Sequence, residues 1–260
     1  MKKRLVGVVH LPPLPGSPAA WPMDRILAQV DADLRALTAA GIEEVIVENF
    51  GDAPFFAERV PAVTVAAMTA CMLTARAAAP LSALGVNVLR NDAEAALSIA
   101  ATTGAQFIRV NVHTGARVTD QGLVQGRAAE TLRLRKALDA PHVAIWADVD
   151  VKHSAPLGVR PLEDEAHDLA SRGMVDALLV TGAGTGKSTD SEKVRRVKST
   201  TSLPVLVASG ATVETLPQCL AVADGIIVGS DLRSGGKAGG PVDAERAKRF
   251  AEAFRKIAGA

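Results

Sequence analysis

Short apolar segments alternate with segments of helical character along the whole chain. Two of them, Val205–Val207 and Ile226–Val228, are wholly apolar and mostly β-branched, which suggests strands buried on both faces of a parallel sheet. The predicted strands are Leu5–Val9, Val45–Val47, Ala83–Leu89, Phe107–Val112, Val143–Val149, Ala177–Val180, Val205–Val207 and Ile226–Val228. They recur about every 30 residues, as in βα repeats. We therefore predict a (β/α)8 TIM barrel, one domain covering residues 1–260.

Helices are expected between these strands. They are Met23–Ala40, Ala62–Ala79, a helix capped by Asn91 or Asp92 and ended by Gly104, one that runs to about Leu138, Leu162–Arg172, one from about Ser191, one between the last two strands, and Val242–Ile257. Residues 113–126 are expected to form a polar loop, and residues 150–153 to extend the fifth strand. A doubly wound open sheet is the alternative, but the even alternation supplies no topological switch point.

Composition excludes several classes of protein. The net charge is +1, aromatic residues make up 3% and Tyr is absent, so no nucleic-acid partner is expected. Cys71 and Cys219 lack metal-ligand spacing and are expected to be buried thiols in a reducing compartment, the cytoplasm. The basic N-terminus is followed by an apolar run that His10 and prolines interrupt, which argues against secretion. No apolar stretch of about 20 residues predicts a membrane span.

Polar residues gather where the predicted strands end. In a (β/α)8 barrel these carboxyl ends meet at one mouth, where active sites form. The polar strand-end residues are His10, Glu48, Asn49, Asn87, Arg90, Arg109, Asn111, His113, Asp148, Asp150, Lys152, His153 and Thr181. Few of these residue types are buried without a partner. We select Glu48, Asp148, Asp150, Lys152, His10 and Asn111 as candidate catalytic residues.

The densest polar group is Asp148, Asp150 and Lys152. Strand alternation predicts that all three point to one side, with the two carboxylates raising one carboxyl pKa and the ammonium opposing that rise. Such a group can carry out acid–base chemistry, bind a divalent cation or hold a sugar hydroxyl. A structural ion-pair network is the alternative. Lys152 could also form a Schiff base, although its acidic neighbours disfavour that role.

Glu48 is either a general base with a pKa raised by apolar surroundings or a buried partner of Arg109 or Lys152. His10 and His113 are candidate proton carriers, or hydrogen-bonded loop anchors. His10, His113, Asp148 and Asp150 show no metal-ligand spacing. The sequence thus requires no cofactor and assigns no metal site.

The two last strands end in small residues, Ser209-Gly210 and Gly229-Ser230. Glycine leaves backbone N–H groups accessible, and the loops after strands 7 and 8 of such barrels often bind phosphate. Gly182, Gly184 and Thr185 in the sixth loop are further candidates, with Lys187 closing over the anion. That loop is no nucleotide P-loop, because Thr181 stands where the motif needs Gly.

The ordered segments resemble the BtpA/SgcQ family. The resemblance is carried by Val8–Pro18, Val47–Phe55, Gly85–Asp92, Phe107–Val112, Ala147–Ser154, Val180–Gly186 and Ala223–Ser230. It covers essentially the whole chain and implies a (β/α)8 barrel. It also implies either a cyanobacterial role in photosystem I biogenesis or a role among sugar-phosphate and carbohydrate-operon proteins, and it transfers no catalytic residue.

Two hypotheses about function follow. In the first, the chain is an enzyme that acts on a small phosphorylated sugar-like or nucleoside-like ligand by proton-transfer, lyase or glycosyl chemistry. In the second, it is a non-catalytic assembly factor for a membrane protein complex. The Ala-rich helices would also suit contacts between subunits of a homo-oligomer.

Overall fold

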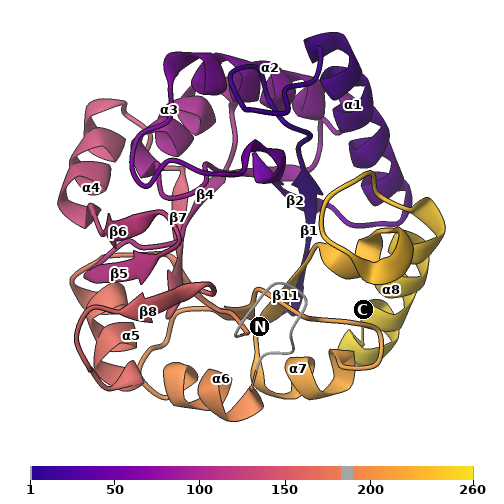
Figure 1. Ribbon diagram of the computed structural model, residues 1–260. Coiled ribbons are helices and arrows are strands. Elements are labelled where there is room, and N and C mark those ends of the chain that lie inside the picture. The colour runs from indigo at the N-terminus through magenta and orange to yellow at the C-terminus, as the bar shows by residue number, and fades with distance from the viewer. Residues whose placement is uncertain (1, 183–189, 260) are drawn as a thin grey trace.

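Eight parallel strands close into a barrel in the structure, a computed structural model that describes residues 2–182 and 190–259 (Figure 1). Around the barrel they are β1 (Arg4–His10), β2 (Glu44–Glu48), β3 (Ala83–Asn87), β4 (Phe107–Val110), β7 (Ala144–Val149), β9 (Ala177–Val180), β10 (Val205–Val207) and β11 (Gly225–Val228). The pairing of β1 with β11 closes the cylinder. The (β/α)8 prediction is therefore confirmed.

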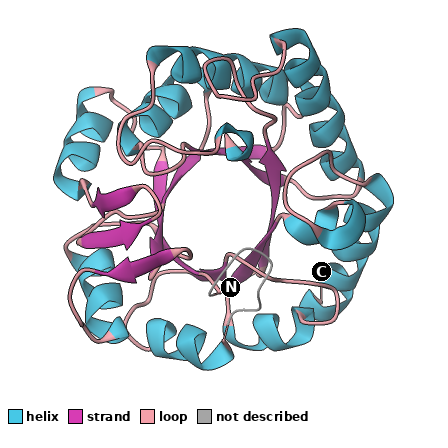
Figure 2. Cartoon of the chain, viewed as in Figure 1, coloured by secondary structure: helices cyan, strands magenta, loops and turns pink. Residues whose placement is uncertain are grey.

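Within the described residues, eight α-helices surround the strands (Figure 2). They are α1 (Met23–Ala39), α2 (Ala62–Ala78), α3 (Ala93–Thr103), α4 (Ala128–Ala137), α5 (Leu162–Ser171), α6 (Ser191–Lys198), α7 (Leu216–Val222) and α8 (Ala244–Ala258). Asp92 caps α3 by accepting a hydrogen bond from the Ala95 N–H, and Gly104 ends it with φ +69°, as predicted for these two residues.

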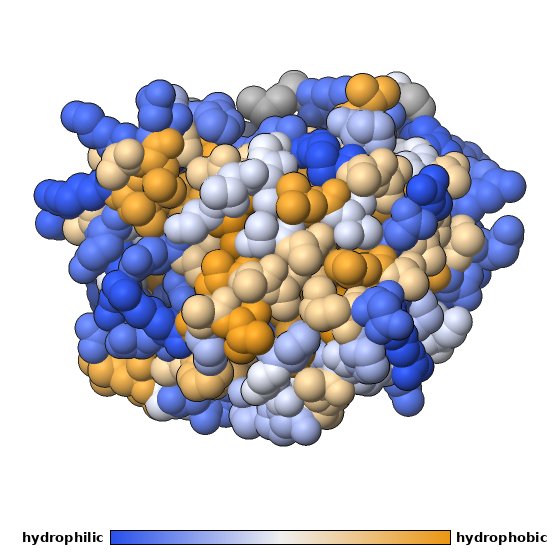
Figure 3. All heavy atoms as spheres, turned by 90° about the horizontal axis from the view of Figure 1, so that it is seen from above, coloured by the Kyte–Doolittle hydropathy of each residue, from blue (hydrophilic) through white to orange (hydrophobic). Residues whose placement is uncertain are grey.

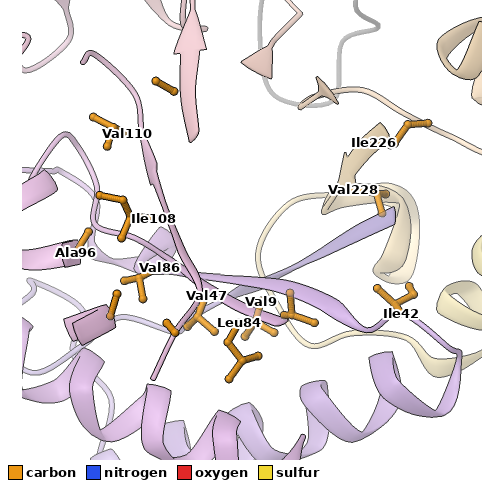
Figure 4. Close-up of a cluster of buried hydrophobic side chains, with 14 of the residues drawn as sticks. Val9, Ile42, Val47, Leu84, Val86, Ala96, Ile108, Val110, Ile226 and Val228 are labelled. Carbon is orange, nitrogen blue, oxygen red and sulfur yellow. The ribbon is translucent and has the colours of Figure 1, made fainter. Parts of the chain in front are cut away.

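Alternate residues of each strand divide between two apolar regions. Val47, Val86, Ile108 and Val228 face outward and pack beneath the helices (Figure 4). Their neighbours along the strands face into the barrel, where a second apolar cluster includes Phe107. Because side chains alternate along a strand, the inward-facing positions at the strand ends come together at the mouth.

The opposite end of the barrel is filled by side chains. The rings of Phe107 and Trp146 stack with centroids 3.8 Å apart, and the Arg4 guanidinium lies over Trp146 at 4.4 Å. Arg4 also donates to Glu44 at 2.6 Å. Gly85 leaves the space that Phe107 needs, since a Cβ atom there would stand 2.1 Å from the ring.

The prediction of a polar loop at residues 113–126 is wrong. A small antiparallel sheet forms from β5 (Ala116–Thr119), β6 (Gly122–Gln125) and β8 (Ser154–Pro156). Leu123 is exposed while Val124 is buried against Val112 and Val151, the alternation of a one-sided sheet. Gly122, with φ +94°, allows the tight turn.

The outer surface carries apolar residues on the side that lies at the top of Figure 1. Figure 3 shows them mixed with polar side chains, and Val63 and Leu73 of α2 and Leu81 after it are exposed. Among the residues described, no helix combines the length and the apolar character needed to cross a membrane. Cys71 and Cys219 are free and buried.

Candidate active site

Glu48 is the centre of the polar group at the barrel mouth. It is the last residue of β2, is 6% exposed and binds a side chain from each neighbouring strand. His10, at the end of β1, places Nε2 3.2 Å from Oε1 of Glu48. Asn87, at the end of β3, donates from Nδ2 to Oε2 at 3.2 Å. Both carboxylate oxygens are therefore held in place.

The hydrogen bonds of His10 fix its tautomer. The Gly239 N–H donates to Nδ1 at 3.0 Å, so Nδ1 is unprotonated and Nε2–H donates to Glu48. Burial lowers the pKa of His10 and outweighs the opposing effect of Glu48. His10 is thus a neutral donor that orients Glu48, with its ring stacked on Phe50 at 4.4 Å.

Glu48 is ionised in this setting. Burial alone would raise its pKa, but the hydrogen bond from His10 and the positive charges of Arg109 and Lys152 hold the pKa well below its usual range. Of the two sequence interpretations, a general base with a raised pKa is therefore wrong. The structure supports a buried carboxylate in an electropositive site, though its direct partners are His10 and Asn87 rather than a cation.

Asp148 holds two side chains of the β4 segment. Nη2 of Arg109 donates to Oδ1 and Oδ2 of Asp148, both at 3.1 Å. Nδ2 of Asn111 donates to Oδ2 at 2.6 Å. The Asp148 side chain is fully buried and engaged on both oxygens. Its role is to position Arg109 and Asn111.

Lys152 does not pair with Asp148 or Asp150, the acidic residues predicted to lie beside it. Its backbone is fixed by the N–H donating to Thr181 Oγ1 at 3.1 Å and by its carbonyl accepting from Arg90 Nη2 at 2.7 Å. Within the ranges that the structure describes, no carboxylate forms an ion pair with its ammonium group. Burial, assisted by Arg109, lowers the pKa of Lys152 despite the opposing charges of Glu48 and Asp148.

Asp150 does not join Lys152, so the expected cluster of three is wrong. β7 ends at Val149, and Asp150 has φ +55°, which breaks the strand alternation on which the prediction depended. Asp150 instead pairs with Arg117 Nη1 at 2.6 Å and with Lys193 Nζ at 2.7 Å. It ties β5 to α6, outside the group around Glu48.

The two serine–glycine pairs do come together. Ser209, Gly210, Gly229 and Ser230 line a cavity of about 150 Å³, together with His10, Glu48, Arg109 and Lys152; we name it the serine–glycine cavity. A second cavity of about 400 Å³ shares Glu48, Arg109 and Lys152 with the first; we name it the distal cavity. These three side chains thus lie where the two cavities meet.

Arg233 was missed by sequence reasoning, because it stands in a glycine-rich segment without an apolar pattern. It is 1% exposed and donates to three carbonyl groups of the described residues: Gly229 at 2.5 Å, Val8 at 2.8 Å and Gly240 at 3.1 Å. Burial lowers its pKa to about 10. Arg233 fixes the Gly229 loop against β1, next to His10.

The remaining candidate residues lie away from the group around Glu48 or outside the described residues. His113 Nε2 contacts the carbonyl of Gly173 at 2.9 Å, away from the partners of His10. Gly182 follows Thr181 and is buried, whereas Gly184, Thr185 and Lys187 lie outside the described residues. Across the ranges 2–182 and 190–259, no group of three His, Cys, Asp or Glu side chains is arranged to hold a metal ion.

Solved structures share the fold at low sequence identity. Thiamine phosphate pyrophosphorylase from Pyrococcus furiosus superposes with a TM-score of 0.58 at 15% identity, covering 99% of this chain and 95% of that one. Phosphoribosyl anthranilate isomerase from Thermus thermophilus gives 0.57 at 14% identity, with 98% and 99% covered. These likenesses concern the barrel.

Sequence relatives cover nearly the whole chain. The photosystem I biogenesis protein BtpA of Synechocystis is 42% identical over 255 residues, 96% of this chain and 87% of the relative. An uncharacterised mitochondrial protein of Caenorhabditis elegans is 32% identical, with 94% and 90% covered. The BtpA family model matches residues 1–256. The chain is therefore a member of the BtpA family.

Proposed function

We propose that this protein is an enzyme that binds a small phosphorylated molecule at the barrel mouth and moves a proton on it. One observation carries the proposal: Glu48, Arg109 and Lys152 line both the serine–glycine cavity and the distal cavity. A ligand anchored in one cavity and extending into the other would pass these three side chains.

The phosphate would lie in the serine–glycine cavity. β10 and β11 are the seventh and eighth strands of the barrel sequence, and the loops after these strands form phosphate sites in many such barrels. Gly210, at φ +68°, and Gly229 let the backbone approach an anion closely. The solved neighbours named for a thiamine phosphate and a phosphoribosyl compound support this class of ligand by analogy.

Lys152 is the proton carrier in this proposal. Its lowered pKa provides neutral amine nearer to physiological pH than an ordinary lysine does. The neutral Nζ would take a proton from a carbon next to a carbonyl group, and the C–H electron pair would form an enolate. Arg109 would stabilise the enolate oxygen, and the ammonium would return a proton to the same carbon, where the enolate electron pair forms the C–H bond again.

Glu48 supports this chemistry without exchanging a proton. As an ionised carboxylate fixed by His10 and Asn87, it balances the charges of Arg109 and Lys152 when no ligand is bound. It would also accept hydrogen bonds from ligand hydroxyl groups.

Two measurements test the proposal. Thermal-shift titration with inorganic phosphate and sugar phosphates should stabilise the protein, by about 2.7 kcal/mol at a hundred times Kd. With a binding sugar phosphate in D2O, the wild type should exchange a carbon-bound proton, and Lys152→Met should bind the ligand but lose exchange. Lys136→Met, on the surface of α4, is the control. A flat response to every phosphate would refute the phosphate site.

The name of the Synechocystis relative favours a second candidate, an assembly factor for a membrane complex. In that case the mouth would tolerate substitution. Complementation of an assembly defect by a Lys152→Met variant, without phosphate binding by the wild type, would support this candidate over the enzyme.

A further inference from the structure

Three residues that line the distal cavity carry buried polar atoms that lack partners. Within the described part of the chain, Nε of Arg90, Nε of Arg109 and Oδ1 of Asn111 have no hydrogen-bond partner. These residues are 6%, 5% and 3% exposed, and all three line the distal cavity. Buried polar atoms are normally satisfied, so three such atoms around one cavity indicate a ligand that completes their hydrogen bonds.

The three side chains are fixed by their other atoms. Arg90 donates from Nη2 to the Lys152 carbonyl at 2.7 Å. Arg109 and Asn111 both donate to Asp148. The side chains that carry the unpaired atoms are therefore held in place, which reduces the ordering cost of binding.

The unpaired atoms comprise two guanidinium N–H donors and one amide oxygen acceptor. Guanidinium groups pair most strongly with carboxylates and phosphates. A carboxylate would accept from Arg90 and Arg109, and a hydroxyl group beside it would donate to Asn111 Oδ1. A neutral base edge could satisfy the same count of donors and acceptors, but it would leave Arg90 without a direct ion pair, because Glu48, Asp120 and Asp148 act on its charge from beyond ion-pair distance. Phe50 and Phe55 supply apolar wall on the same cavity.

We propose that the distal cavity recognises a hydroxy-carboxylate group, so that the ligand of this protein is a phosphorylated hydroxy acid. This inference rests on the proposed function, because it extends the phosphate-anchored ligand past Glu48 and Lys152. Arg90 and Arg109 set the specificity for the acid end, and the serine–glycine cavity holds the phosphate.

A matched pair of ligands tests the inference. 6-Phosphogluconate and sorbitol 6-phosphate have the same six-carbon chain and phosphate, but only the first has a carboxylate. Calorimetric titration should show 6-phosphogluconate binding about tenfold more tightly, or more, a difference of about 1.4 kcal/mol. 3-Phosphoglycerate and glycerol 3-phosphate repeat the comparison at three carbons.

Substitution of Arg90 tests whether the carboxylate preference arises in the distal cavity. Arg90→Lys keeps the charge but removes Nε, and we expect it to reduce the affinity ratio within the pairs toward one. Arg59→Lys, at an exposed arginine paired with Glu94, is the matched control and should leave the ratio unchanged. Circular dichroism checks that both variants fold.

The outcomes separate the two proposals. Suppose that inorganic phosphate binds. If the two ligands of each pair then bind with equal affinity, or if neither pair binds, the carboxylate inference is overturned and the phosphate site is retained. A carboxylate preference that Arg90→Lys retains also overturns it. If inorganic phosphate does not bind, the proposed function fails and the phosphorylated ligand fails with it. Gluconate against sorbitol then tests the distal cavity directly: tighter binding of gluconate supports recognition of a hydroxy-carboxylate group there, and equal or absent binding refutes it.

Discussion

A Cβ atom on Gly229 would stand 3.1 Å from both Cε1 and Nε2 of His10. The backbone after β11 therefore lies against the imidazole that orients Glu48. We expect Gly229→Ala to push His10 away by a few tenths of an ångström and to crowd the serine–glycine cavity, which would weaken inorganic phosphate binding about tenfold. Gly158→Ala is the control, because a Cβ there meets nothing within 4 Å. Equal loss of binding in both variants would contradict this role.

Lys152 should give the proposed reaction a characteristic pH dependence. The neutral amine is the base, and burial lowers its pKa, so proton exchange should rise with pH through a midpoint below the ordinary lysine value of about 10.4. Isotope exchange into a bound sugar phosphate, measured between neutral and alkaline pH, gives this midpoint. A midpoint at or above the ordinary value would rule out Lys152 as a desolvated base.

Asp33 of α1 should make stability depend on pH. It is 1% exposed, and burial raises its pKa to about 6 from 3.8. Its contribution to stability is therefore complete below the unfolded-state pKa and is lost as the pH rises through about 6. Because Asn can still accept the hydrogen bond from the Val242 N–H, we expect Asp33→Asn to be more stable than wild type at pH 8, by about 1–3 kcal/mol.

Urea unfolding at several pH values measures this effect. The difference between Asp33→Asn and wild type should disappear near pH 4, where the aspartate is protonated in the folded state. Asp31→Asn on the same helix is the control, since the hydrogen bond from exposed Arg35 lowers its pKa instead. A stability gain for Asp33→Asn that is independent of pH would disprove the assignment.

Asp148 and Asp150 should respond differently to the same substitution. Asp148→Asn leaves Arg109 without its buried counter-charge, and we expect a loss of stability of about 3 kcal/mol. Asp150 has a side chain that is 39% exposed, so Asp150→Asn should cost about 1 kcal/mol or less. Urea unfolding of the two variants measures the difference. Similar losses would show that the buried pair is no more important than the exposed one.

Gly85→Ala should destabilise the barrel. The new Cβ atom would overlap the Phe107 ring at 2.1 Å, and that ring is stacked on Trp146. Overpacking of this kind costs about 1–3 kcal/mol. Thermal unfolding checks it, again with Gly158→Ala as the control. An unchanged melting temperature would mean that the stacked rings can move aside.

The sequence predicted the fold well because each βα unit carries its own apolar pattern. Strand and helix positions depend on local periodicity, and the closed barrel follows from eight repeats. The hairpin of β5 and β6 escaped prediction because four-residue strands with mixed polarity produce no clear period. The sequence signal that could have indicated the hairpin turn is Gly122, which follows the polar pair at 120 and 121.

The candidate site was predicted in outline, and the reasons for the errors are physical. Glu48, His10 and Lys152 were placed at the mouth because strand ends converge there. Their partners depend on register between strands, which local sequence does not encode: Glu48 meets Asn87 across β2 and β3. The left-handed backbone at Asp150 and the buried Arg233 follow from tertiary contacts.

The stacked rings of Phe107 and Trp146, with Arg4 behind them, make the far end of the barrel a floor. In the proposed enzyme, substrate would therefore enter and product would leave through the same mouth of the barrel. Product that stays bound at the mouth would block the next substrate molecule, so product should inhibit competitively with substrate.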